Sequence, residues 1–471
     1  MSADVESAFA SIAETGERYR AGTLSPVELT EALLDRIGRL DGRLHAFITV
    51  ADAGARADAR SAEARLRRGD PGPLVGIPLA VKDNIATRGI RTTGNSRVLE
   101  DWIPGRDALA VERLRAAGAV ILGKTNLNEL GWSIPADGDL CPPARNPWNP
   151  AYAAIGSSSG SAAAVAAGLA AAALGTDGGG SVRLPAGQMG LVGVKPTHGT
   201  VPSAGSLSEG STIGDIGVLA RGVDDARVLT GVLMARDLGG RGGRRPERPR
   251  LDGVRVGVPR RFIEQVPVEP EVAEAFAAAL AALAGLGAVL SDVDLSGMAA
   301  ARTANFVALI AEHYASHESF LPGHWSRYGR SARLYLAHGA FLSAADYLAA
   351  QETGRIVRRE IDRILARVDL LATPVSPVVT AEAARRPEAH RRGINASFTS
   401  PFNLTGHPGV SVPCGVGAAG LPIGLQLIGR HHAEAAVLDA AHAYERATEW
   451  HRLRPHLAPG AAAATEGGGP A

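Results

Sequence analysis

Two turns rich in glycine and serine flank an apolar run near the middle of the chain. The first turn is GSSSG at residues 156–160, and the second is GGGS at residues 178–181. A flexible linker would not enclose an apolar run, because such a run has to be buried. Serine hydroxyls held in such turns are candidates for nucleophilic catalysis, in which a base removes the hydroxyl proton.

Two other interpretations of the first turn are weaker. Backbone N–H groups before a helix can bind phosphate, but the G-x-x-x-x-G-K-[ST] pattern and its lysine are absent. Residues 156–160 also match the G-x-S-x-G elbow, with Ser158 as the nucleophile. That elbow must follow a strand, and the preceding NPWNP at residues 146–150 argues against a central strand. No histidine is singled out by its context as the base.

Lys82 is a base of a different kind. It ends a short apolar run at residues 79–81, which we expect to be a buried strand. Burial disfavours the charged ammonium group and lowers its pKa, so such a lysine accepts a proton near neutrality. A lysine at a strand end more often extends its aliphatic stem to reach water. Position alone therefore leaves both interpretations open.

The elements that would position these residues alternate along the chain. A capping box at residues 25–28 starts a helix, and further helices are expected at 108–117, 272–283, 344–366 and 433–447. Strands are expected at residues 79–81, 119–122, 254–258, 368–372, 410–413 and 424–428. The alanine-rich residues 162–174 are too short for a membrane span of about 20 residues, and we expect a buried helix that spaces the two turns. This alternation indicates an α/β fold.

Composition excludes several classes of protein. The 471 residues include 49 Lys+Arg and 48 Asp+Glu, and this balance gives no long-range attraction to nucleic acid or anionic membranes. Cys141 and Cys414 are far apart, which fits a reduced, cytoplasmic setting and no disulfide framework. No apolar targeting segment begins the chain. We expect a surface connector at residues 239–250 and a disordered tail at residues 456–471.

An ordered set of motifs resembles the amidase signature family. The set comprises GIPLAVKDN around Lys82, GKTNLNE at residues 123–129, NPW at 146–148, GSSSGSAAAVAAG at 156–168, DGGGSVRLPA at 177–186, GVKPT at 193–197 and GLPIGLQLIGR at 420–430. The resemblance implies one α/β domain over residues 1–455, with a large mixed β-sheet covered by helices.

The same resemblance implies amide hydrolysis by a Ser–cis-Ser–Lys triad. Ser181 would be the nucleophile, Ser157 the bridging serine and Lys82 the base. The implied oxyanion hole consists of backbone N–H groups of Gly178, Gly179, Gly180 and Ser181, and the implied supporting residues are Ser158, Asp177 and Arg183. No metal or organic cofactor is implied.

This chain departs from the family pattern in both turns. Ile155 and Ser159 stand where the family usually has glycine, and Gly178 stands where it usually has threonine or isoleucine. We interpret these changes as tuning of the pocket, because all three triad residues are present.

Two functions remain open at this stage. One is a stand-alone amidase for a small molecule, and the other is the glutaminase (A) subunit of a tRNA-dependent amidotransferase. The stretch TVPSAGSL at residues 200–207 departs from what we expect of that subunit, which favours the stand-alone enzyme. On that interpretation the partner is a small-molecule amide, with no direct contact to nucleic acid or a membrane and a homodimer as the assembly to consider.

The substrate itself is not identified by the motifs. Variable segments at residues 300–341 and 386–403 are expected to wall the pocket. Their aromatic side chains favour a hydrophobic or aromatic acyl group, although such residues can equally form core.

Overall fold

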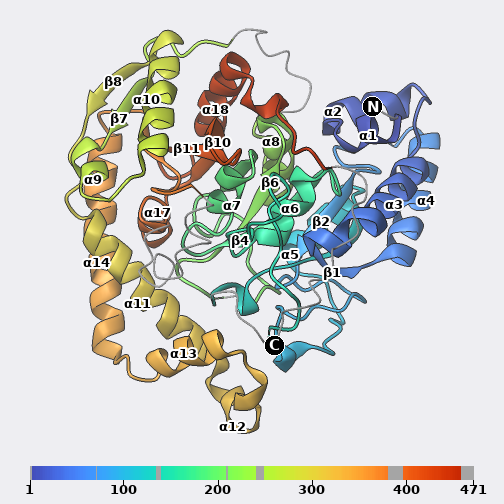
Figure 1. The fold of residues 1–471 in the computed structure, drawn as a ribbon, viewed down its shortest axis with the longest axis horizontal. Helices are drawn as coiled ribbons and strands as arrows, with labels where there is room; N and C mark the ends of the chain where they lie inside the picture. Colours follow the sequence, from blue (N-terminus) through green and yellow to red (C-terminus); the bar gives the residue numbers. More distant parts are fainter. Residues whose placement is uncertain are drawn as a thin grey trace, which may run out of the picture.

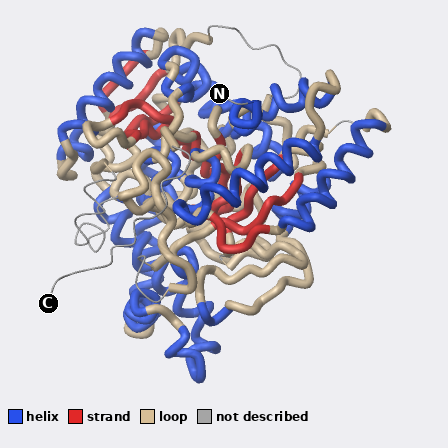
Figure 2. Tube along the Cα trace, turned by 45° about the vertical axis from the view of Figure 1, so that its right-hand side comes forward, coloured by secondary structure: helices blue, strands red, loops and turns tan. Residues whose placement is uncertain are grey.

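The computed structural model describes residues 3–70, 72–133, 139–207, 210–239, 249–379 and 396–457. Within these ranges an eleven-stranded sheet runs through the molecule in the order β1-β3-β2-β4-β6-β5-β10-β11-β9-β7-β8. The strands are β1 (Phe47–Val50), β2 (Pro78–Lys82), β3 (Val120–Thr125), β4 (Ala172–Asp177), β5 (Val192–Lys195), β6 (Asp215–Ala220), β7 (Arg255–Val258), β8 (Val289–Asp292), β9 (Leu370–Pro374), β10 (Gly409–Val416) and β11 (Pro422–Ile428). Figure 2 shows these strands crossing the interior, with helices around them.

The sheet is mixed, and its parallel part positions the first candidate residues. β2 is parallel to β3 and β4, whereas β6 is antiparallel to β4 and to β5. Because parallel strands end at the same edge of a sheet, the ends of β2 and β4 lie together. Lys82 closes β2 and Asp177 closes β4, so both strands deliver their last residues to one place.

Helices cover the sheet and extend beyond it. They are α1 (Ala3–Ala8), α2 (Ile12–Arg20), α3 (Pro26–Leu44), α4 (Asp52–Arg67), α5 (Leu109–Ala116), α6 (Ser159–Ala166), α7 (Arg183–Gln188), α8 (Val223–Met234), α9 (Arg260–Glu264), α10 (Pro270–Gly285), α11 (Met298–His317), α12 (Leu321–His324), α13 (Arg330–Gly339), α14 (Ala344–Leu365), α17 (Ser400–Leu404) and α18 (Glu434–Thr448). In Figure 1, α1 to α4 lie at the β1 end of the sheet, and α9 and α10 lie at the β8 end. The pair α11 and α14 packs side by side, and α13 and α12 continue past it (Figure 1).

The expected fold class, one α/β domain with a large mixed sheet covered by helices, is confirmed. The strands expected from apolar runs are present as β2, β3, β7, β9, β10 and β11, and the expected helices as α3, α5, α10, α14 and α18. The apolar runs succeeded because the central strands are buried along their whole length, so nearly every residue in them is hydrophobic.

The alanine-rich run is a helix followed by a strand, so the expectation of one helix over residues 162–174 is wrong. Helix α6 ends at Ala166, and Gly168 takes φ +66° in the turn that follows. The next segment is β4, which pairs with β2 on one side and β6 on the other. Alanine has the highest intrinsic helix propensity, and pairing with β2 and β6 overrides that preference over β4.

No helix in the described part of the chain is long and apolar enough to cross a membrane. Parts of three segments discussed above lie outside the described residues. They are residues 240–248 of the expected connector, residues 386–395 of the expected pocket wall and residues 458–471 of the expected tail.

Candidate active site

Lys82 is fully enclosed at the end of β2. Its Nζ lies 2.7 Å from Ser157 Oγ and 2.8 Å from Thr176 Oγ1. Burial lowers the pKa of Lys82 to about 7, and the charge of Asp177 opposes this shift only in part. A large share of Lys82 is therefore uncharged at neutral pH and able to accept a proton from the hydroxyl of Ser157.

Two further lysines are equally buried but have different partners. Lys195 Nζ lies 3.0 Å from Asp215 Oδ2, and Lys124 Nζ lies 3.7 Å from Asp83 Oδ1. Burial lowers the pKa of both, that of Lys124 to about 8, and the carboxylate partner of each opposes the shift by favouring the charged ammonium form. Lys82 instead contacts two hydroxyl groups and one backbone carbonyl. Of these three buried lysines, Lys82 is the one whose surroundings suit a base.

Ser157 and Ser158 lie in the turn that leads into α6. A Cβ at Gly156 would come within 2.8 Å of the Ser158 nitrogen, so this turn requires glycine. Ser158 Oγ donates to the carbonyl of Thr176 at 3.2 Å and accepts from its N–H group at 3.3 Å. The N–H group of Ser158 donates to the carbonyl of Ser181 at 3.1 Å. Ser158 thus fastens the first turn to β4 and to the second turn.

Ser181 stands at the end of a glycine loop that directly follows β4. Gly180 has φ +121°, and a Cβ there would lie 2.1 Å from Thr399 Oγ1, so the position requires glycine. Thr399 Oγ1 and Asn305 Nδ2 donate to the carbonyls of the second and first glycines of the loop, at 2.7 and 3.2 Å. The loop is held by these outside side chains, and Ser181 itself is partly exposed.

One backbone N–H group of the glycine loop is already engaged and so is removed from the expected oxyanion hole. The N–H group of Gly180 donates to Asp177 Oδ1 at 2.6 Å and so already has an acceptor. This bond leaves the predicted oxyanion role with the N–H groups of Gly178, Gly179 and Ser181.

The expected cis peptide bond at the bridging serine is absent, because every described peptide bond is trans. In the second turn, the positive φ of Gly180 changes the chain direction.

Asp177 and Arg183 form a fully buried ion pair behind the glycine loop. Arg183 Nη2 and Nε lie 3.0 Å from Asp177 Oδ1 and Oδ2 respectively. Burial alone would raise the pKa of Asp177, but Arg183 and Asn403 hold it well below its usual range. Arg183 also donates to Gln426 Oε1 at 2.7 Å, which connects the pair to β11. The pair therefore fixes the loop relative to the sheet.

Several residues that contact the site were not found from the sequence. From Arg183, its partners Thr399, Asn403 and Gln426 lie 216 to 243 residues further along the chain. Gln426 belongs to the GLPIGLQLIGR motif and the other two to the variable segment at residues 386–403, but neither signal assigned them a role. Asn84 donates to Thr176 Oγ1 at 3.0 Å and so orients the second partner of Lys82. Asn84 belongs to the KDN motif, so that motif was the signal that could have found it.

The aromatic side chains of the segment at residues 300–341 take part in a cluster of rings. Trp132 stacks on His313 with ring centroids 4.8 Å apart, and Tyr335 meets Trp132 edge-on at 5.9 Å. Phe341 is 88% exposed. These rings largely pack on one another or face solvent, and it is Leu309 whose side chain approaches the first glycine of the loop.

Replacing the two adjacent serines separates the triad from the elbow interpretation. Ser157→Ala is expected to lower kcat/KM about 10²- to 10⁴-fold, because the hydroxyl next to Lys82 is lost. Ser158→Ala is expected to cost less than about tenfold in rate. It should instead lower the free energy of unfolding by about 1–3 kcal/mol, because a buried N–H group loses its acceptor. Amide kinetics and urea unfolding on both variants test this, and the reverse ranking of rates would restore Ser158 as nucleophile.

Comparison with known proteins identifies the family. The sequence profile described as "Amidase" matches residues 28–438, and the chain belongs to the amidase family. The A subunit of glutamyl-tRNA(Gln) amidotransferase from Roseiflexus castenholzii is 37% identical, over 95% of this chain and 97% of that protein. The protein of the same name from Moorella thermoacetica is 38% identical, over 92% of this chain and 96% of that protein.

Solved structures give the same family. A crystal structure of an amidase superposes with a TM-score of 0.83 at 31% identity, covering 93% of this chain and 99% of the other. The native peptide amidase of Stenotrophomonas maltophilia gives a TM-score of 0.78 at 30% identity, over 95% and 98% of the two chains. The glutamyl-tRNA(Gln) amidotransferase A subunit of Thermotoga maritima gives 0.76 at 31% identity, over 93% and 95%. The chain is thus an amidase-type hydrolase acting on carbon–nitrogen amide bonds.

These relatives correct one expectation drawn from the sequence. The expected partners, a small-molecule amide with no direct contact to nucleic acid and a homodimer as the assembly to consider, are contradicted by curated relatives that are subunits of a tRNA amidotransferase. The error has a chemical origin: the motifs describe amide hydrolysis, which stand-alone enzymes and such subunits share. Residues 200–207, the stretch used to separate them, pack against the segment after β2, where Leu207 N–H donates to the carbonyl of Asn84 at 2.9 Å.

Proposed function

We propose that the chain hydrolyses a carboxylic amide through an acyl-enzyme on Ser181, with Ser157 as the bridging serine and Lys82 as the base. The observation that carries this proposal is the 2.7 Å contact between Lys82 Nζ and Ser157 Oγ in a fully buried position. The bond from Ser158 N–H to the carbonyl of Ser181 supports it, because it holds the two serine turns side by side.

The proposed reaction moves one proton along the triad and back. Neutral Lys82 accepts the proton of Ser157, Ser157 accepts that of Ser181, and the Ser181 oxygen bonds to the amide carbonyl carbon. Backbone N–H groups of the glycine loop stabilise the developing oxyanion, an effect typically worth about 3–4 kcal/mol per donor. The proton then reaches the amide nitrogen, the C–N bond breaks and the amine or ammonia leaves. Water attacks the ester and releases the acid.

This role of Lys82 predicts a rise of activity with pH. Because burial lowers the pKa of Lys82 to about 7, the ammonium form dominates below that pH and cannot accept a proton. The value of kcat/KM for an uncharged amide is therefore expected to rise through about pH 7 and level off above it. A rate profile between about pH 5.5 and about pH 9, on protein checked for folding at each pH, measures this. A rate independent of pH across neutrality would contradict Lys82 as the base.

For the substrate, the curated relatives favour the amidotransferase interpretation. We propose that the chain releases ammonia from the side-chain amide of glutamine for a partner subunit that amidates glutamyl-tRNA. The supporting observation is identity of 37–38% to two such amidotransferase subunits, over at least 92% of this chain and 96% of those proteins. The neutral charge balance of the chain fits a partner subunit that contacts the tRNA.

A second candidate is hydrolysis of another small amide. The observation that favours it is structural: the crystal structure of an amidase superposes better, at a TM-score of 0.83, than the Thermotoga subunit, at 0.76. The segments that surround an acyl group differ between such enzymes more than the triad does.

Ammonia release separates the two candidates. The purified chain, alone and together with the other amidotransferase subunits of its own organism, is given glutamine, a panel of primary amides, and anilides whose amine release is followed. Glutamine hydrolysis that increases when the partner subunits are added is the expected result. Efficient cleavage of another amide, with glutamine left intact in every assembly, would establish the second candidate instead.

A further inference from the structure

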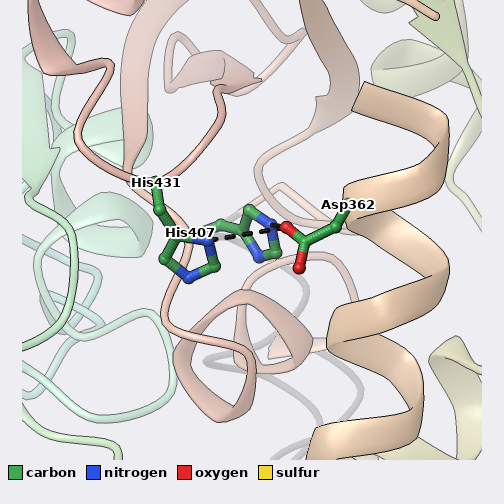
Figure 3. A group of neighbouring side chains, drawn as sticks. All are labelled: Asp362, His407 and His431. Carbon is green, nitrogen blue, oxygen red and sulfur yellow. Dashed lines mark hydrogen bonds and ion pairs between the residues drawn. The ribbon is translucent and has the colours of Figure 1, made fainter. Parts of the chain in front are cut away.

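Asp362, His407 and His431 form a compact cluster at the far end of α17 from the glycine loop. Asp362 lies in the last turn of α14, His407 precedes β10 and His431 follows β11. One ligand atom from each, two ring nitrogens and a carboxylate oxygen, all lie within 4.8 Å of one another. Figure 3 shows both rings gathered at the carboxylate.

The backbone determines which nitrogen of His431 carries the proton. Its Nε2 lies 3.0 Å from the carbonyl oxygen of Thr405. A carbonyl oxygen only accepts, so Nε2 must be the donor. In a neutral ring, Nδ1 then has a free lone pair, and it lies 3.6 Å from Asp362 Oδ1.

The hydroxyl group of Thr405 bears on which nitrogen of His407 carries the proton. The hydroxyl of Thr405 donates its single hydrogen to the carbonyl of Pro401 at 3.0 Å. In that arrangement it accepts from His407 Nδ1 at 2.9 Å, and Nδ1 carries the ring proton. The lone pair is then on Nε2, which lies 3.1 Å from the same oxygen of Asp362.

With these tautomers, two ring lone pairs face one carboxylate oxygen, and a cation between them would relieve the repulsion of these electron-rich atoms. Histidines that bind metals typically donate the opposite N–H to a backbone or side-chain oxygen, as both rings do through Thr405.

We propose that Asp362, His407 and His431 bind one divalent transition-metal ion, with Zn²⁺ as the best match. Tetrahedral zinc with bonds of about 2.0–2.1 Å needs ligand atoms about 3.3 Å apart. The two contacts to Asp362, at 3.1 and 3.6 Å, already fit that spacing. Two imidazoles with one carboxylate suit zinc, cobalt or nickel, whereas magnesium and calcium prefer oxygen ligands alone.

The surroundings determine how such an ion would enter and what it would do. The side chains of Asp362 and His431 are 49% and 24% exposed, so a metal ion and a water ligand reach the cluster from solvent. Arg358, one turn earlier on α14, places a positive charge near Asp362 and His431 and works against a cation. The ion would connect the end of α14 to the residues before β10 and after β11. This position is separate from Ser181, where the proposed chemistry takes place.

Cobalt titration tests this site directly. The full chain is prepared without an affinity tag, freed of metal with a chelator and titrated with Co²⁺, whose visible absorption reports nitrogen ligands. We expect one Co²⁺ per chain, displaced by Zn²⁺, and a higher melting temperature with either ion, because a ligand that binds only the folded state stabilises it. His431→Gln and Asp362→Asn should each weaken binding at least about tenfold.

The neighbouring His432 supplies a matched control. It is exposed and lies outside the cluster, so His432→Asn should keep wild-type affinity. Asp362→Asn replaces the carboxylate of a half-exposed side chain with an uncharged amide of the same shape, so it tests the site even if a histidine variant folds poorly. Absence of stoichiometric binding by the wild type would overturn the proposal, as would unchanged affinity in Asp362→Asn and His431→Gln.

Discussion

Replacing Ser181 by alanine is expected to abolish amide turnover while the fold stays intact. The loss of a catalytic nucleophile typically costs several orders of magnitude in kcat, because the covalent path is no longer available. The loop should keep its shape, since Asp177, Thr399 and Asn305 hold it through its backbone rather than through the Ser181 side chain. Steady-state kinetics on the best amide, together with thermal unfolding, measure both effects.

Covalent labelling provides the control for Ser181. A sulfonyl fluoride reagent should add its mass to the wild type and to Ser158→Ala, and not to Ser181→Ala. Ser158 also lies beside β4 and is fully buried, so its replacement disturbs the same region without removing the proposed nucleophile. Labelling that is lost only in Ser181→Ala therefore indicates loss of the nucleophile and not loss of the pocket. If Ser181→Ala kept activity within about tenfold of the wild type, the assignment of the nucleophile would be wrong.

The sequence predicted those parts of the fold that depend on local pattern. Strands such as β11, which is buried at every residue, can be recognised in the sequence as apolar runs. Strands β1, β5, β6 and β8 were not expected from the sequence: β8 is largely exposed and β1 has four residues, whereas β5 and β6 are buried at every residue but are interrupted by glycine. The alanine run failed for a different reason: its division at Gly168 depends on β2 and β6 pairing with its second half.

The candidate site divides in the same way. Lys82 and the two serine turns were visible in the motifs, and the structure brings Lys82 and Ser157 into contact. The side chains that shape the glycine loop, such as Thr399, come from a distant segment whose position only the tertiary fold determines. The engagement of the Gly180 N–H by Asp177 was equally invisible, because a motif names residues and not their hydrogen-bond partners.

Replacing Lys82 by alanine is expected to slow amide hydrolysis more than ester hydrolysis. An amine leaves only when its nitrogen receives a proton, and in the proposed triad that proton returns from Lys82 through Ser157. A nitrophenolate ion leaves without protonation. Both substrates need Ser181 to be deprotonated, so both reactions slow, but the amide loses an acid as well as a base. Each function is typically worth about 10²- to 10⁴-fold.

The measurement is kcat/KM for an anilide and a nitrophenyl ester with the same acyl group, for wild type and Lys82→Ala. Sharing the acyl group removes any difference in binding, so the ratio of the two losses isolates protonation of the leaving group. Lys82 is fully buried, so unfolding of the variant must be measured beside its kinetics. Equal proportional losses on both substrates would refute the acid role. Unchanged rates on both would show that a lysine with a pKa of about 7, 2.7 Å from Ser157, takes no part in the reaction.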